Sequence, residues 1–207
     1  MAFYSGASNL VSGDTNYFCG IHYPYENCPD IFVHDRQTGS TQRVSIASDG
    51  SQGNNYSDWP SISTDGRYVV FTSYASNLVS GDTNRSGDIF VHDRQTGSTQ
   101  LVSIASDGTQ GNSYSWEPSI STNGRYVAFT SWASNLVSGD TNKFCGSPLE
   151  GVANIQGFHS IFKHKIGDRS TNLATPPPEY YNCPDVFVHD RGGRNFVFYL
   201  PVTQNQP

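Results

Sequence analysis

Two nearly identical segments decide the fold, PSISTDGRYVVFTS at residues 60–73 and PSISTNGRYVAFTS at residues 118–131. Asp-Gly and Asn-Gly are strong hairpin signals, and each stands here between a short alternating stretch and a run rich in Tyr, Val and Phe. Residues 59–63 and 67–72 are therefore predicted to form two antiparallel strands joined by a type I′ turn at Asp65-Gly66.

The hairpin belongs to a unit that occurs three times in the chain. The sequence ASNLVSGDTN starts at Ala7, Ala75 and Ala133, and the sequence D(I/V)FVHDR starts at Asp30, Asp88 and Asp185. The uninterrupted copies are offset by 58 positions (88 − 30). Copies this similar normally bury their cores against one another, so the chain is predicted to be a repeat array.

The rest of the unit supplies two more strands. Residues 88–92 alternate in the manner of a strand, residues 94–97 form a turn, and residues 100–104 form the fourth strand. Residues 106–112 then lead to the next copy. Four antiparallel strands joined in sequence are the pattern of a propeller blade.

The segments at 60–73 and 118–131 resemble the WD40-like, or TolB-type, β-propeller repeat, and the resemblance covers nearly the whole chain outside 143–182. It implies an all-β fold of three four-stranded antiparallel propeller-type blades, at about 1–49, 50–107 and 108–207. The variant is similar to tandem arrays in secreted or surface proteins of bacteria, which implies an extracellular or cell-surface location. Propellers host many unrelated activities, so the resemblance implies no single function.

The first blade is predicted to be incomplete. Residues 1–5, Met-Ala-Phe-Tyr-Ser, align with residues 127–131, Val-Ala-Phe-Thr-Ser, which belong to the second strand of a unit. Closed propellers have at least about four blades, and an isolated array of three would expose apolar faces and a strand edge. We therefore expect the array to be completed by oligomerisation.

Composition limits the possible partners. The chain has 12 Lys and Arg against 18 Asp and Glu, a formal net charge of -6, which does not favour binding to nucleic acid. No apolar run approaches the roughly 20 residues of a membrane helix. With 35% hydrophobic and 14% charged residues, the composition is that of a folded domain.

Four cysteines bracket two insertions between the second and third strands of a unit. Cys19 and Cys28 flank the short insertion of the first copy, and Cys145 and Cys183 flank the long insertion at 143–184 of the third. The second copy has neither cysteines nor an insertion. Strand ends at such a base lie close enough for disulfides, which predicts both pairs and an oxidising compartment. Zinc is the alternative, but no Cys-x-x-Cys spacing is present.

Acidic loops in the repeats suggest a calcium site. Asp82, Asn84 and Asp88 place oxygen side chains at positions 1, 3 and 7 of one loop, which suits a hard cation. Their counterparts are Asp14, Asn16 and Asp30 in the first copy and Asp140, Asn142 and Asp185 in the third. The alternative is that these are ordinary turn residues. Calcium is the only cofactor that the sequence suggests.

No catalytic site is predicted, and the chain is not expected to be an enzyme. His34, His92 and His189 recur in Val-His-Asp-Arg, but a catalytic site needs one convergent set of groups rather than three identical strand ends. A structural role at the hairpin is the preferred interpretation. No nucleophile elbow, phosphate loop or metalloprotease motif occurs in the sequence.

Aromatic residues recur in the segments that connect the units. Tyr56 and Trp59, like Tyr114 and Trp116, could stack on sugar rings or could pack one blade against the next. Packing is the preferred interpretation, and sugar stacking stays the alternative.

The predicted function is that of a non-enzymatic extracellular structural protein whose main partners are other copies of itself. The tail residues Val202, Thr203, Gln204 and Asn205 are predicted to add a strand to the first blade of a neighbouring copy. Such head-to-tail contacts give a filament or a ring. The alternative function is a propeller module that binds a glycan or a cell-surface protein and is stabilised by calcium.

Overall fold

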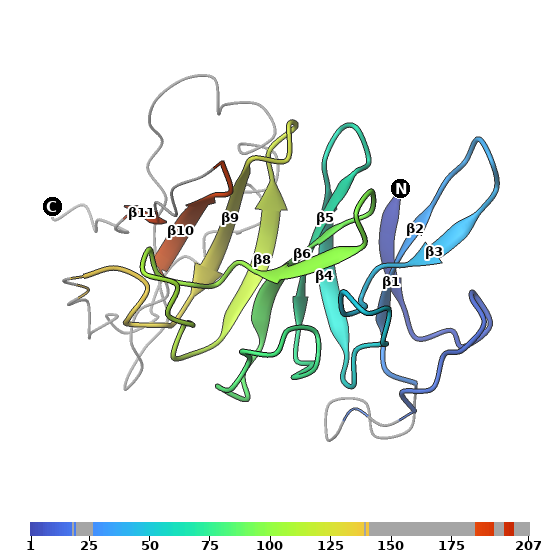
Figure 1. Ribbon diagram of the computed structural model, residues 1–207, viewed down its shortest axis with the longest axis horizontal. Coiled ribbons are helices and arrows are strands. Elements are labelled where there is room, and N and C mark those ends of the chain that lie inside the picture. The colour runs from blue at the N-terminus through green and yellow to red at the C-terminus, as the bar shows by residue number, and fades with distance from the viewer. Residues whose placement is uncertain (18, 20–26, 139, 141–184, 193–196, 201–207) are drawn as a thin grey trace, which may run out of the picture.

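The protein consists of three antiparallel sheets placed one after another (Figure 1). The computed structural model describes residues 1–17, 19, 27–138, 140 and 185–192, and the backbone of 197–200. The first sheet contains β1 (Ala2–Ser5), β2 (Asp30–His34) and β3 (Thr41–Arg43). The second contains β4 (Ser57–Ile62), β5 (Tyr68–Ser73), β6 (Asp88–Asp93) and β7 (Ser98–Leu101), and the third β8 (Ser115–Ile120), β9 (Tyr126–Ser131), β10 (Asp185–Asp190) and β11 (Val197–Leu200). The described residues contain no helix.

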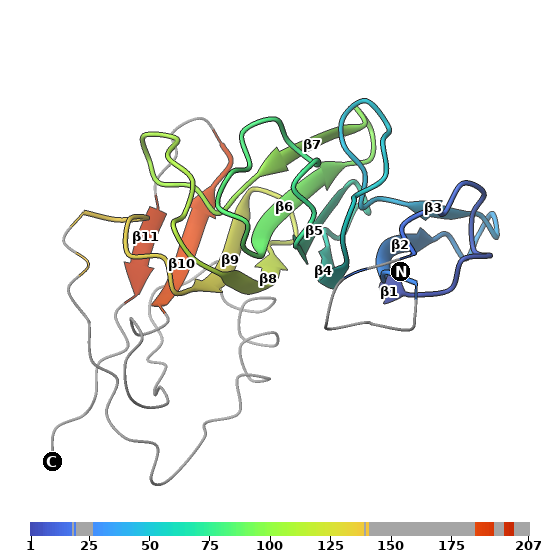
Figure 2. The same ribbon diagram turned by 90° about the horizontal axis from the view of Figure 1, so that it is seen from below.

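Each sheet is a meander in which strands that follow in sequence are also neighbours in space. In the second sheet the order is β4-β5-β6-β7, and Phe71 of β5 lies opposite Phe90 of β6. The third sheet repeats this register, with Phe129 of β9 opposite Phe187 of β10. Figure 2 shows the three sheets side by side along the molecule, each with the strand order expected of a propeller blade.

The hairpins between the first two strands differ from the predicted type I′ turn. A type I′ turn needs positive φ at both central residues, whereas only Gly66 has it, at 72°. The Gly66 N–H donates to the Ser63 carbonyl over 2.9 Å, which closes a type I turn followed by a left-handed glycine. The Asp65 carboxylate accepts hydrogen bonds from the Ser63 hydroxyl and from the Arg67 N–H, which fixes this longer loop. The type I′ prediction is therefore wrong.

The fourth strand ends earlier than predicted, at Leu101 instead of residue 104. The reason is Ser103, whose hydroxyl oxygen accepts the Ile89 N–H over 3.2 Å in place of a backbone carbonyl. Ile104 then forms only an isolated bridge with Gln110. The side chain of Ser103 therefore ends the regular pairing between β6 and β7.

A bulge interrupts the first strand of both complete sheets. The register between β4 and β5 shifts between Asp58 and Ser61, and Trp59 in the bulge has a positive φ of 50°. Glu117 occupies the matching position in β8, with a φ of 51°. A proline follows each of these residues and cannot donate to a ladder, so the bulge is a property of the repeat.

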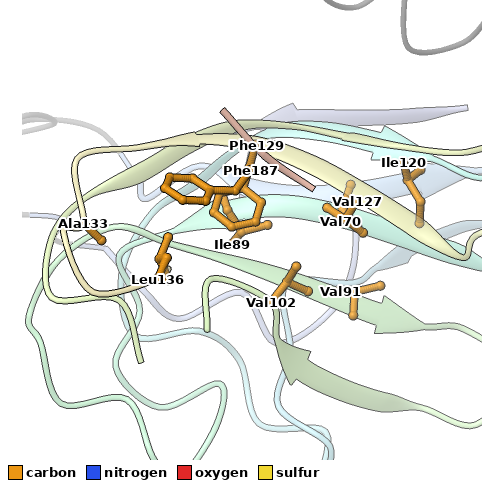
Figure 3. Close-up of a cluster of buried hydrophobic side chains, with 10 residues drawn as sticks. All are labelled: Val70, Ile89, Val91, Val102, Ile120, Val127, Phe129, Ala133, Leu136 and Phe187. Atoms are coloured by element: carbon orange, nitrogen blue, oxygen red, sulfur yellow. The ribbon is translucent and has the colours of Figure 1, made fainter. Parts of the chain in front are cut away.

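The core lies between the sheets, in two clusters that repeat the same contacts. One cluster joins the first and second sheets through Ile31, Val33, Val44, Val69, Phe71, Ala75, Leu78 and Phe90. The other joins the second and third sheets through Val70, Ile89, Val91, Val102, Ile120, Val127, Phe129, Ala133, Leu136 and Phe187 (Figure 3). We call these contacts the first and the second junction. The array is held together by burial of apolar surface between neighbouring sheets.

Candidate functional site

The predicted calcium residues of the second repeat meet around an amide. The Gln110 Nε2 donates to Asp82 Oδ1 and to Asp88 Oδ2, each over 2.9 Å. The Ser103 hydroxyl donates to Asp88 Oδ1 over 2.6 Å. Asp88 is fully buried, and this burial raises its pKa to about 7. The two carboxylates therefore share one neutral donor.

The first repeat builds the same arrangement and adds a cation. Gln52 Nε2 donates to Asp14 Oδ1 over 2.9 Å and to Asp30 Oδ2 over 2.7 Å. The Arg43 guanidinium lies 3.7 Å from Asp14 and 3.5 Å from Asp30. Leu101 occupies the matching position of the second repeat, so of these two acid pairs the first has an arginine beside it and the second does not.

The asparagines of these loops form hydrogen bonds with backbone groups. Asn16 Nδ2 donates to the Gly53 carbonyl and Asn84 Nδ2 to the Gly111 carbonyl, while Asn84 Oδ1 accepts the Ser86 N–H. The third loop has Asp140 and the buried Asp185 within the described residues, whereas Asn142 lies outside them. Among the described residues no group of three or more His, Cys, Asp or Glu side chains could hold a metal ion. Calcium binding stays a prediction.

The predicted disulfide between Cys19 and Cys28 is present, with the two Cα atoms 5.4 Å apart. Both cysteines are buried and pack against Tyr56 and Tyr74. The Cys28 N–H also donates to the Asn16 carbonyl over 3.0 Å, which ties the insertion to the acidic loop. The predicted pair of Cys145 and Cys183 lies outside the described residues.

The repeated aromatic residues form a ladder across the sheets. Tyr56 stacks on Tyr74 at 4.5 Å between ring centroids, and Tyr74 meets Tyr114 at 5.5 Å, from the second sheet to the third. Tyr114 continues onto Trp116 at 5.0 Å. Tyr56 is buried, whereas Trp59 is 48% exposed. Tyr114 and Trp116 are half-buried, so Trp59 is the most exposed member of the predicted set. Sugar stacking and packing between blades both stay predictions for these residues.

Two of the three recurring histidines hydrogen-bond to a threonine of the following strand, while the buried Nδ1 of His189 has no hydrogen-bond partner among the described residues. His92 is buried, and its Nδ1 lies 2.9 Å from the Thr99 hydroxyl; burial lowers its pKa. His34 makes the same contact with Thr41 over 3.0 Å. The aspartate that follows His92 is bound by Arg67 in a bidentate pair, with the Arg67 Nη2 2.7 Å from Asp93.

One open pocket of about 420 Å³ lies beside the β4–β5 hairpin. It is lined by Asp65, Gly66, Arg67, Arg94 and Gln95. Arg67 is engaged with Asp93, and Arg94 donates to the Gly66 carbonyl over 2.7 Å, so both guanidinium groups already have partners.

The arginine of the Asp-Arg motif makes contacts across each junction. At the first junction Arg94 reaches across to Gln42 Oε1 of β3, at 3.3 Å from Nη2. At the second junction Arg191 lies over the Tyr68 ring, 4.1 Å from its centroid. Arg191 Nη1 also donates to the Gly124 carbonyl over 2.7 Å. Each arginine thus binds the hairpin of its own sheet and a side chain of the sheet before it.

The first sheet buries only in part the residues whose counterparts in the other two sheets are fully buried. Phe71 and Leu78 of the second repeat are 0% and 2% exposed at the first junction. Their counterparts in the first repeat are Phe3, which is half-buried, and Leu10, which is 36% exposed. Ala7 is half-buried, whereas its counterpart Ala75 is fully buried. The sequence alignment could have identified this face, because the matching residues are the apolar members of ASNLVSGDTN and of β1.

One edge of β1 pairs with no strand among the described residues. In the second sheet β5 pairs on one side with β4 and on the other with β6, whereas β1, its counterpart, pairs only with β2 among the described strands. Tyr4 of β1 is 57% exposed, while the matching Thr72 is fully buried. The predicted strand donor, Val202 to Asn205, lies outside the described residues.

No protein-family model and no curated protein matches the chain. Among solved structures, the putative TolB from Agrobacterium tumefaciens is 18% identical with a TM-score of 0.40, over 83% of this chain and 40% of that one. The acylaminoacyl peptidase from Pyrococcus horikoshii is 14% identical with a TM-score of 0.39, over 84% of this chain and 21% of that one. TolB from Acinetobacter baumannii is 14% identical with a TM-score of 0.27, over 84% and 38%. The chain thus spans at most 40% of these proteins, and likeness at this level carries no conclusion about function.

Within the described part of the chain, no helix is long and apolar enough to cross a membrane.

Proposed function

We propose that this protein is a non-enzymatic structural module that associates head to tail with further copies of itself, outside the reducing cytosol. The observation that carries the proposal is the apolar face of the first sheet, which contains Phe3, Ala7 and Leu10. At the two junctions within the chain, the matching residues are buried against a neighbouring sheet.

Burial of this face is favourable because apolar surface is removed from water, at roughly 25 cal/mol for each Å². The two internal junctions, which use the same residue types, show that such faces pack well with a neighbour of this repeat. The open edge of β1 adds unpaired backbone groups that a further strand can satisfy. A second copy supplies both kinds of partner.

The location rests on the disulfide. The bond between Cys19 and Cys28 is buried beside Tyr56, and structural disulfides of this kind persist in oxidising compartments. An extracellular or cell-surface site, as the repeat resemblance implies, agrees with it.

The proposal predicts self-association that depends on concentration and on the exposed face. Light scattering after size-exclusion chromatography is expected to show the average mass of the wild-type protein rising with concentration. Leu10→Asp places a charge on the face and is expected to reduce the protein to a folded monomer, whose melting temperature falls only by the stabilisation that association supplies to the wild type.

Ser80→Asp is the matched control, because it adds the same charge at an exposed position that makes no side-chain hydrogen bond within the described residues. A wild-type protein that stays monomeric up to millimolar concentration would contradict the proposal. So would a Leu10→Asp variant that associates as strongly as the control.

A further inference from the structure

We infer that the first sheet of one copy docks on the third sheet of a second copy in the register of the second junction, with Arg36 stacked on the partner's Tyr126. This inference rests on the proposed self-association and names the surfaces that perform it. It is drawn from the second junction, where the structure contains both halves of the contact.

At the second junction a tyrosine lies between two arginines. Arg67 of the same sheet is 4.7 Å from the Tyr68 ring centroid, and Arg191 of the next sheet is 4.1 Å from it. Cations over an aromatic face are attracted by the ring quadrupole. Gly124 allows the close approach, because a Cβ at this position would overlap the Tyr68 ring. The arginine from the Asp-Arg motif is therefore the element that reaches across the junction.

The third sheet carries the receiving half of this contact a second time. Arg125 lies over the Tyr126 ring at 5.0 Å, as Arg67 lies over Tyr68, and no second arginine from the described residues covers the ring. Val186 and Val188 match Ile89 and Val91, which are buried in the second junction, yet both valines remain half-buried. The third sheet thus presents a tyrosine and two valines in the places where the second sheet receives its neighbour.

The first sheet carries the inserting half. Arg36 stands in the Asp-Arg motif where the other copies have Arg94 and Arg191, but it is exposed and makes no hydrogen bond or ion pair with any described residue. The first sheet also contains Phe3 and Leu10. Their counterparts in the third repeat, Phe129 and Leu136, are buried in the second junction. If a second copy follows the third sheet as the third sheet follows the second, its Arg36, Phe3 and Leu10 all contact the third sheet.

The two faces are different surfaces, so the contact is heterologous and each copy has one inserting and one receiving face. The partner is a second copy of this chain rather than an unrelated protein, because both faces match the halves of a junction that the chain already forms within itself. The contact accordingly extends the array by three sheets with each added copy.

The head-to-tail direction of the association is tested with two variants, each of which blocks one of the two faces. Leu10→Asp blocks the inserting face and Val188→Asp the receiving face, and circular dichroism with thermal melts verifies that both remain folded. Each variant alone is expected to be monomeric, and their equimolar mixture is expected to form 1:1 dimers that grow no further. A mixture that stays monomeric while the wild-type protein associates would overturn the inference but not the proposed function. Monomeric wild-type protein would overturn both.

The stack is tested by a double-mutant cycle on the association constant. Arg36→Ala and Tyr126→Leu are each expected to weaken association about tenfold, which corresponds to about 1.4 kcal/mol and lies within the range of cation–π contacts. Together they are expected to weaken it hardly more than either alone, and Tyr126→Phe is expected to retain most of the affinity. Arg85→Asn, which removes an exposed arginine elsewhere, serves as the charge control. Additive effects, or an unchanged constant in Arg36→Ala, would overturn the assignment of this pair.

Discussion

At the scale of single residues, one difference between repeats changes the chemistry of a buried acid pair. Arg43 stands beside Asp14 and Asp30 in the first repeat, whereas Leu101 stands at the same position in the second. Gln110 donates to both carboxylates of the second pair but brings no charge. The chain therefore contains one acid pair with an arginine beside it and one without. Comparing variants of the two pairs isolates the effect of the arginine's charge.

The acid pair without an arginine makes stability depend on pH. Burial raises the pKa of Asp88 from 3.8 to about 7 and also raises that of Asp82, so between about pH 4 and pH 7 the folded protein binds more protons than the unfolded chain. The contribution of these groups to stability falls as the pH rises through this window. Leu101→Arg is expected to raise the melting temperature at pH 8 by a few degrees, and by less at pH 5.

Arg43→Leu is the reciprocal variant and is expected to lower the melting temperature more at pH 8 than at pH 5, because it leaves Asp14 and Asp30 without their cation. Thermal melts at the two pH values check both variants. Shifts that are the same at both pH values would show that the arginine acts through packing and not through charge.

Calcium can neutralise the negative charge of Asp82 and Asp88 if the Gln110 amide turns and presents its oxygen beside the two carboxylates. Added calcium is then expected to raise the melting temperature of the wild-type protein, since a ligand that binds only the folded form stabilises it. Leu101→Arg is expected to remove this effect, and a chelator is expected to reverse it. An absent shift in the wild-type protein, or an equal shift in both proteins, would contradict calcium binding at this site.

At the scale of elements, the hairpins join strands and also form part of the junctions. Gly124, in the β8–β9 hairpin, supports the Tyr68 ring of the neighbouring sheet and has a φ of 72°. Gly66 has the same φ in the β4–β5 hairpin, but a Cβ there would meet only the end of Arg94, at 3.7 Å. The two glycines share a left-handed backbone conformation and differ in the contact that they allow.

Gly124→Ala is therefore expected to destabilise the protein more than Gly66→Ala does, by about 1–3 kcal/mol, because only the first substitution forces a ring to move in a packed junction. Both variants carry the same cost of an L-residue at positive φ, which cancels in the comparison. Urea denaturation measures the difference. Equal losses would mean that Tyr68 moves aside freely.

The elements show where sequence patterns suffice and where they do not. The four-strand unit was predictable, because short runs rich in Val, Phe and Tyr recur between Asp-Gly, Asn-Gly and other turn signals. The turn type was not, because Asp65 is held by hydrogen bonds from Ser63 and Arg67 that a dipeptide signal does not contain. Likewise, β7 ends early because of Ser103, whose role depends on the distant Ile89.

The same limit applies to the candidate site. The spacing of the acidic residues predicted that those of one loop lie close together. It did not indicate that Gln52 and Gln110 stand between the carboxylates, because these glutamines come from the connection to the next repeat. The pairing of Cys19 with Cys28 followed from spacing alone, since the two strand ends must meet.

At the scale of the whole molecule, the array is a row of sheets with two unlike ends. The first sheet presents Phe3 and Leu10, and the third presents Val186 and Val188, so any association that matches the internal junctions has a direction. A ring follows if the rotation between copies closes, and a filament follows if it does not. The alignment of the repeats indicates the apolar residues of these faces, and the structure shows which of them a neighbouring sheet buries.

The near identity of the two junctions also has a consequence for how such chains change over generations. A whole repeat inserted between the second and third sheets would find the same valines, phenylalanines and tyrosine on either side that its neighbours already use. Its ends would need no adaptation. The length of the array can thus grow or shrink by entire units while every boundary keeps its fit, so the sheet, and not the residue, is the smallest step by which this molecule varies in size.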